Sequence, residues 1–94
     1  MSTYVVTYDL HTPGQKYECL SKKLEAYGTY YHIQGSVWII KTNKSAAAVR
    51  DELVGCLDGN DKLIVARLSG EAAWYGYPTN GSEWLKDVLE RAAA

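Results

Sequence analysis

The chain has 94 residues, of which 47% are hydrophobic and 22% charged, and its formal net charge is −1 at pH 7. These values are typical of one folded domain and exclude a disordered or fibrous chain. They also exclude a global positive field that would attract nucleic acid, so such binding would need a local patch or a dimer groove.

The expected location follows from what the sequence lacks. No hydrophobic stretch approaches the roughly 20 residues that span a bilayer, and Met1-Ser2-Thr3 leads directly into a predicted strand without a basic region or cleavage site. We expect a cytoplasmic protein with no membrane partner. Cys19 and Cys56 have neither the spacing of metal ligands nor the density of a secreted disulfide framework, so both are expected to be reduced.

The first two predicted elements are a strand and a helix. Residues 4–10 are rich in Val and Tyr, which favours a mostly buried strand. Residues 12–15, Thr-Pro-Gly-Gln, form a capping box with proline at the first helical position, which predicts a helix start. The hydrophobic stripe of this helix comprises Tyr17, Leu20, Leu24 and Tyr27, and Gly28 ends it.

The middle of the chain predicts two strands and a second helix. Residues 29–34 and 36–42 flank Gly35, which indicates either a hairpin or one long strand kinked at the glycine. Ser45 then caps a helix. The stripe of that helix comprises Ala46, Val49, Leu53, Cys56 and Leu57.

The C-terminal part begins with a turn at 58–61 and a strand at 62–68, in which Leu63, Ile64 and Val65 are expected to be buried. Residues 71–77 are predicted as a short fifth strand and 78–81 as a loop. Ser82 then caps a last helix that carries Trp84, Leu85, Val88 and Leu89. Such a helix is marginal alone in water, so we expect it to dock.

This order of elements predicts an α+β, ferredoxin-like βαββαβ domain at 1–78, followed by a C-terminal helical extension at 79–94. Both helices of the domain would cover one face of the sheet. The other face would carry residues such as Tyr31, Trp38 and Trp74, which are too large to leave in water. A homodimer that packs sheet against sheet is the simplest way to bury them.

Asp9 is the first candidate for chemistry, and two interpretations stay open. A carboxylate between a strand and a helix cap is commonly a turn former. A two-fold axis nearby would instead set two Asp9 side chains face to face, where they repel unless a cation lies between them. Magnesium suits that arrangement because it accepts one or two carboxylates and keeps several waters, and it can support phosphodiester cleavage.

The remaining candidates are two histidines and a set of lysines. His11 and His32 could transfer protons, but a solvated loop histidine and a half-buried sheet residue are the plainer interpretations. The lysines could contact phosphates; for those of the first helix a solvated face is the alternative, because Glu18 and Glu25 dilute the charge. These lysines are Lys16, Lys22, Lys23, Lys41 and Lys44.

The sequence lacks the motifs that are typical of cofactor enzymes. The sequence has no phosphate-binding glycine loop, no paired metal-ligand cysteines and no nucleophile elbow. Its 8 tyrosines and 3 tryptophans could stack on bases. Because the chain has no phenylalanine, however, most of them are expected to form the core.

Three short runs together resemble a known family. The first strand ends in Tyr8-Asp9-Leu10, the first helix closes in Tyr27-Gly28, and residues 34–38 read Gln-Gly-Ser-Val-Trp. Their order and spacing resemble those of the small CRISPR-associated Cas-two proteins and their relatives, the VapD-type ribonucleases and the SinR-like proteins. The resemblance covers roughly residues 3–77.

The resemblance implies a ferredoxin-like homodimer in which residues 71–77 cross to pair with the partner's sheet. It also implies that Asp9 of both subunits faces a shared cleft and holds Mg²⁺ or Mn²⁺, with metal-dependent nuclease activity in some members. Other members bind duplex DNA as scaffolds without using the aspartate. This chain has His32, Gln15 and Lys16 where members often place arginines, which would weaken phosphate binding.

Two hypotheses follow. In the first, the protein is a Cas-two-like endonuclease that hydrolyses RNA or DNA at a dimer cleft, with Asp9 as the metal ligand and His11 or His32 assisting proton transfer. In the second, it is a non-catalytic dimeric module that binds nucleic acid or protein. The acidic balance with few arginines favours the second.

Overall fold

The computed structural model describes residues 1–11, 15–69 and 71–93, and the side chains in these ranges except at 15, 16 and 89–93. The predicted capping residues 12–14 lie outside these ranges. The described elements are β1 (Ser2–Asp9), α1 (Gln15–Glu25), β2 (Thr29–Gln34), β3 (Val37–Thr42), α2 (Ala46–Val54), β4 (Lys62–Leu68) and α3 (Thr79–Ala93). The protein is therefore an α+β protein.

The strands form one antiparallel sheet in the order β2-β3-β1-β4. Strand β1 runs through the middle, where Val5 pairs with Ile39 of β3 on one side and Ala66 of β4 on the other. Strands β2 and β3 form a hairpin, which confirms one of the two alternatives predicted around Gly35. Within the described chain, β2 and β4 are the edges of the sheet.

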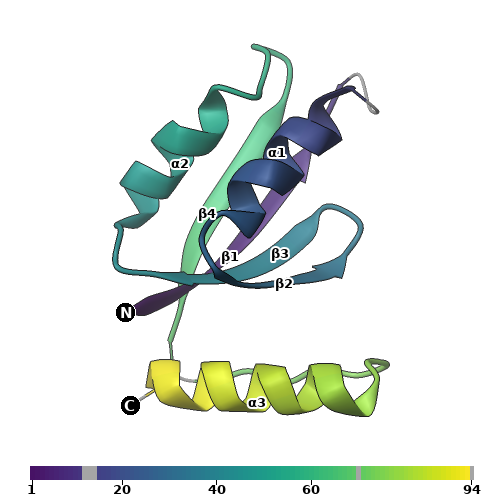
Figure 1. Cartoon of the computed structure of the whole chain (residues 1–94), viewed down its shortest axis with the longest axis vertical. Helices are drawn as coiled ribbons and strands as arrows, with labels where there is room; N and C mark the ends of the chain where they lie inside the picture. The colour runs from purple at the N-terminus through teal and green to yellow at the C-terminus, as the bar shows by residue number, and fades with distance from the viewer. Residues whose placement is uncertain (12–14, 70, 94) are drawn as a thin grey trace.

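Helices α1 and α2 cover one face of the sheet (Figure 1). Alternate residues of β1 face these helices, because successive side chains of a strand point to opposite sides. Side chains of β1 and β3 pack there against the predicted stripes of the helices. The buried residues of this helix-side core include Tyr4, Val6, Tyr8, Trp38, Ile40, Leu20, Leu24, Val49 and Leu53.

Local signals explain where these two helices begin and end. The Ser45 hydroxyl accepts a hydrogen bond of 3.1 Å from the Ala48 N–H, so the predicted cap of α2 is confirmed. Gly28 has φ of 89°, a left-handed conformation that costs glycine little, and it follows the end of α1. Helix α2 ends at Val54, so Cys56 and Leu57 lie just beyond it rather than on its stripe.

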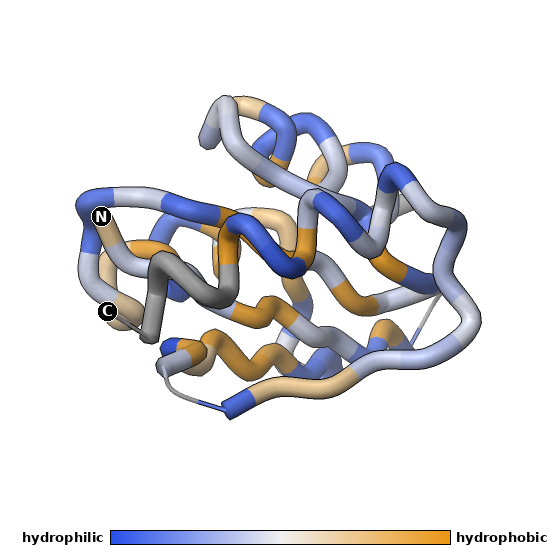
Figure 2. Tube along the Cα trace, turned by 90° about the horizontal axis from the view of Figure 1, so that it is seen from below, coloured by the Kyte–Doolittle hydropathy of each residue, from blue (hydrophilic) through white to orange (hydrophobic). Residues whose placement is uncertain are grey.

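Helix α3 docks on the opposite face of the sheet (Figure 1). Leu85 is 1% exposed and packs with Ile39, and partly buried aromatic residues surround them. Those aromatic residues are Tyr31, Trp74, Tyr77 and Trp84. In the coloured part of α3 in Figure 2, hydrophobic and hydrophilic residues follow one another, as expected of an amphipathic helix with one face on a sheet.

The docking of α3 contradicts the expectation that a second subunit covers this face of the sheet. The sequence suggested that a second subunit would bury Tyr31 and Trp74, but α3 of the same chain covers this aromatic cluster. Trp38 was assigned to the wrong face, since it is 2% exposed within the helix-side core. The aromatic residues therefore give no structural reason for a dimer.

The predicted short strand at 71–77 is wrong, because residues 71–77 adopt no strand and instead lead across to α3. The last helix begins at Thr79, so Ser82 lies in its first turn and is not the cap. Ile64 is 61% exposed rather than buried, because α3 leaves that part of β4 uncovered. No helix in the described ranges is long and apolar enough to cross a membrane.

The prediction that both cysteines are reduced is wrong as well. Cys19 and Cys56 form a disulfide with 5.8 Å between their Cα atoms. Cys19 lies on α1 and Cys56 follows the end of α2, so the bond joins the two helices that cover one face of the sheet. The two cysteines are 37 residues apart in the sequence, and only folding brings their helices together. Their proximity could therefore not be predicted from local sequence patterns.

Candidate functional site

Asp9 is the last residue of β1, directly opposite Lys62 at the start of β4. Its side chain is exposed, whereas the preceding Tyr8 is 5% exposed in the helix-side core. Strand alternation therefore assigns Asp9 to the same face as Thr7 and Ile64, the face on which α3 docks elsewhere. The exposure of Ile64 marks this part of the face as uncovered.

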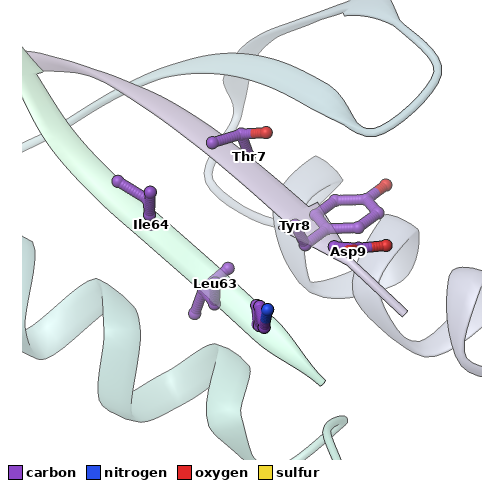
Figure 3. A pocket seen from close by; sticks show the side chains of 6 residues that line it. Thr7, Tyr8, Asp9, Leu63 and Ile64 are labelled. Atoms are coloured by element: carbon purple, nitrogen blue, oxygen red, sulfur yellow. The ribbon is translucent and has the colours of Figure 1, made fainter. Parts of the chain in front are cut away.

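A shallow cavity of about 200 Å³ lies at this end of the sheet (Figure 3). It is formed by the ends of two neighbouring strands, which contribute Thr7, Tyr8, Asp9, Lys62, Leu63 and Ile64. Among the described residues, the Asp9 carboxylate has no hydrogen bond and no ion pair. Within the described part of the chain, it is therefore an exposed acceptor beside a small open cavity.

The chain beyond Asp9 is held by a different carboxylate. Asp61 accepts a hydrogen bond of 2.8 Å from the His11 backbone N–H through one oxygen, and one of 2.8 Å from the Asp58 N–H through the other. The turn before β4 thus anchors the segment that leaves β1. His11 remains exposed, two residues beyond Asp9.

His32 belongs to another environment. Its ring stacks on that of Trp38 with 4.2 Å between centroids, and its Nε2 lies 2.7 Å from the Gly35 carbonyl oxygen. Trp38 in turn donates a hydrogen bond of 3.1 Å to the Tyr8 hydroxyl, and burial raises the pKa of Tyr8. Because these rings lie on the helix side of the sheet, the structure does not bring His32 together with Asp9.

The candidate lysines do not form one open basic patch. Lys22 pairs with Glu18 at 3.1 Å, and Lys23 donates to the backbone carbonyl of Glu52 at 2.7 Å. Lys44 pairs with the Glu52 carboxylate at 2.7 Å. Lys41 lies half-buried on β3, and the side chain of Lys16 lies outside the described part.

Glu52 is the centre of a polar cluster that sequence reasoning missed. Its carboxylate accepts hydrogen bonds from Lys44 and, at 2.9 Å, from the Tyr27 hydroxyl. The hydrogen bond from Lys44 lowers the pKa of Glu52, whereas burial and then the hydrogen bond to Glu52 raise the pKa of Tyr27. No sequence signal links these residues, because they come from separate elements that meet only in the fold.

The described residues contain no group of three His, Cys, Asp or Glu side chains that could hold a metal ion. One subunit therefore offers the single carboxylate of Asp9 rather than a complete set of protein ligands. Magnesium accepts one or two carboxylates and otherwise retains waters, so two copies of Asp9 would be a chemically suitable donor set.

The fold and site together define a small α+β protein with a four-stranded antiparallel sheet and an exposed carboxylate at the end of its central strand β1. A scan of the sequence against models of known protein families finds no match.

Proposed function

We propose that the protein is a homodimeric, Cas-two-like, metal-dependent nuclease in which Asp9 of each subunit binds a shared divalent cation. The observation that carries this proposal is the exposed Asp9 carboxylate, which has no partner among the described residues and borders an open cavity. Asp61, by contrast, has a structural role, because its carboxylate accepts hydrogen bonds from two backbone N–H groups.

The topology also supports the proposal. The order of elements and the strand order β2-β3-β1-β4 fit a ferredoxin-like fold. In such a fold the end of the first strand lies at the middle of the sheet, where a two-fold axis can bring together two equivalent side chains. The uncovered part of the sheet beside Asp9 and Ile64 offers the surface for this contact.

In this proposal Asp9 holds Mg²⁺ or Mn²⁺, and the cation supplies Lewis-acid activation of a phosphodiester in RNA or DNA. His11 is the histidine suited to proton transfer, because it is exposed two residues beyond Asp9. His32 has no role, since it stacks on Trp38 on the other side of the sheet.

The test compares the wild type with Asp9→Asn and with Asp51→Asn, which removes an exposed carboxylate that pairs with its neighbour Arg50 on α2. We expect Mn²⁺ to bind the wild type, to raise its melting temperature and to activate cleavage of labelled RNA or DNA. Asp9→Asn should abolish all three effects while leaving the dimer folded, and Asp51→Asn should preserve them. Cleavage retained by Asp9→Asn would reject the proposal.

A second candidate is a non-catalytic dimeric module that binds nucleic acid or protein. The partners of Lys22, Lys23 and Lys44 within the chain favour the protein-binding form of this alternative, because they leave these lysines less available to phosphates. Under this alternative, divalent ions change neither the melting temperature nor ligand binding, and Asp9→Asn binds as the wild type does. Calorimetric titration with Mn²⁺ separates the two candidates, because only the proposed nuclease binds the ion.

A further inference from the structure

A second cavity lies at the opposite edge of the sheet from the Asp9 cavity. Its volume is about 250 Å³, and it lies open to solvent between β2 and the first turn of α3. The residues that line it are Tyr30, Tyr31, Pro78, Asn80, Gly81 and Trp84. Because Tyr30 and Tyr31 are adjacent in a strand, their side chains leave opposite faces, so the cavity lies at the outer edge of β2.

Aromatic rings dominate the walls. Tyr31 packs edge to face on Trp84 with 5.4 Å between centroids, which fixes both rings. Gly81 holds α3 close to β2, because a Cβ at this position would collide with the Tyr31 hydroxyl. The Tyr30 ring packs on Trp38 with 5.7 Å between centroids, and the residue is 39% exposed, so it offers aromatic surface at the edge of the sheet.

The polar groups around the cavity are neutral. No charged residue lines it among the described residues. Asn80 uses its carbonyl oxygen to accept a hydrogen bond of 3.0 Å from the Gly81 N–H, which leaves its amide NH₂ as a donor. Strand β2 is an edge strand of the described sheet, so the backbone N–H and C=O groups on its outer side have no partner strand in the described ranges.

We propose that this cavity binds a nucleobase. Pockets for drug-sized ligands begin at about 300 Å³, so a cavity of about 250 Å³ suits one planar ring system. Such a ring stacks on tyrosine, while its hydrogen-bonding edge can pair with an amide donor and with free backbone groups. The neutral lining matches the uncharged base, whose ribose and phosphates would stay in solvent. This site is separate from Asp9 and does not depend on metal chemistry.

The base has two sources, a free nucleoside or a single-stranded nucleic acid. Titrations of the full chain labelled with ¹⁵N would use adenosine and uridine in one arm, and six-residue oligoadenylate and oligouridylate in the other. We expect shifts confined to the backbone amide signals of residues 30–31 and 79–84. Equal affinity per base in both arms identifies a nucleoside site, and tighter oligonucleotide binding identifies a single strand.

Variants make the test specific. Tyr30→Leu should weaken binding about 5-fold or more, which corresponds to the loss of one stacking contact. Tyr75→Leu is the matched control, because Tyr75 is 97% exposed and lies outside the cavity, and it should bind as the wild type does. Asn80→Ala removes the amide donor from an exposed position and should also weaken binding, which keeps the test decisive if Tyr30→Leu does not fold.

Three results would overturn the proposal. The first is the absence of shifts at millimolar nucleoside and oligonucleotide. The second is a set of shifts that lies elsewhere or survives in both Tyr30→Leu and Asn80→Ala. The third is binding of a proline-rich peptide alone, since aromatic grooves also accept such peptides. Asp9→Asn should bind bases normally, so failure here is distinct from failure of the nuclease proposal.

Discussion

At the scale of single residues, the structure shows which polar side chains are satisfied and which are not. Thr3 is 1% exposed, and its buried hydroxyl has no hydrogen-bond partner among the described residues. Thr42 is buried to a similar degree, but its hydroxyl accepts a hydrogen bond of 3.2 Å from the Lys44 N–H. A buried hydroxyl without a partner costs stability, whereas one with a partner costs little.

Replacing Thr3 with valine should therefore raise the free energy of unfolding by about 1 kcal/mol, because the change removes a desolvated hydroxyl and keeps the shape of the side chain. Thr42→Val is the control and should lower it, since the N–H of Lys44 loses its acceptor. Urea unfolding followed by circular dichroism measures both changes. A loss of stability in Thr3→Val would contradict this interpretation.

The Glu52 cluster gives a prediction of pH dependence. The hydrogen bond from Lys44 lowers the pKa of Glu52 from its ordinary value of 4.5. A carboxylate whose pKa is lower in the folded than in the unfolded state contributes stability above its unfolded pKa, and this is lost as the pH falls through the folded value. Glu52 should therefore stabilise the fold at neutral pH and cease to do so in acid.

Glu52→Gln should accordingly lower the melting temperature at pH 7 and have little effect at pH 2 to 3. The change at pH 7 should be small, because both side chains of the ion pair are about half exposed and solvent screens them. Glu18→Gln is the control, since its ion pair with Lys22 is three-quarters exposed. Melting curves across this pH range test the prediction, and an equal loss at both ends would refute it.

At the scale of elements, α3 has the largest consequence for the molecule. Its docking buries a sheet face that carries several aromatic residues, and Leu85 at its centre is 1% exposed. A helix of 15 residues would be marginal alone in water, so packing supplies most of its stability. Gly81 of α3 lies so close to Tyr31 of β2 that no Cβ would fit between them, which shows that the helix and the strand are closely packed.

Leu85→Ala should reduce the free energy of unfolding by about 2 to 5 kcal/mol, the range for removing a buried leucine side chain. Lys86→Ala, which changes an exposed neighbour on the same helix, should change it by less than about 0.5 kcal/mol. Chemical denaturation of both variants gives these values. If Leu85→Ala were as stable as the wild type, the docking of α3 on the sheet would be in doubt.

At the scale of the whole molecule, one covalent bond spans much of the chain. The disulfide between Cys19 and Cys56 closes a loop of 37 residues and joins α1 to the chain just after α2. Cross-linking limits the conformations of the unfolded chain, and such loops typically stabilise proteins by about 2 to 4 kcal/mol. Disulfides of this kind are rare in reducing compartments.

Adding dithiothreitol should therefore lower the melting temperature of the wild-type protein, because it removes this restriction from the unfolded chain. The double variant Cys19→Ala, Cys56→Ala should melt at a lower temperature than the oxidised wild type, and dithiothreitol should not change it further. Differential scanning calorimetry measures these shifts, with thiol alkylation and mass measurement to confirm the redox state. Equal melting of oxidised and reduced wild type would contradict the stabilising role.

The sequence by itself determined the α+β class, the four described strands, the cap at Ser45 and the position of Asp9 at the end of β1, because each depends on local periodicity or turn chemistry. Only the tertiary structure decided which residues that lie far apart in the sequence contact one another. It joined Cys19 to Cys56, gathered Lys44 and Tyr27 around Glu52, separated His32 from Asp9, and covered the second face with α3. Such long-range contacts depend on how the elements pack, and local patterns do not encode the packing partner.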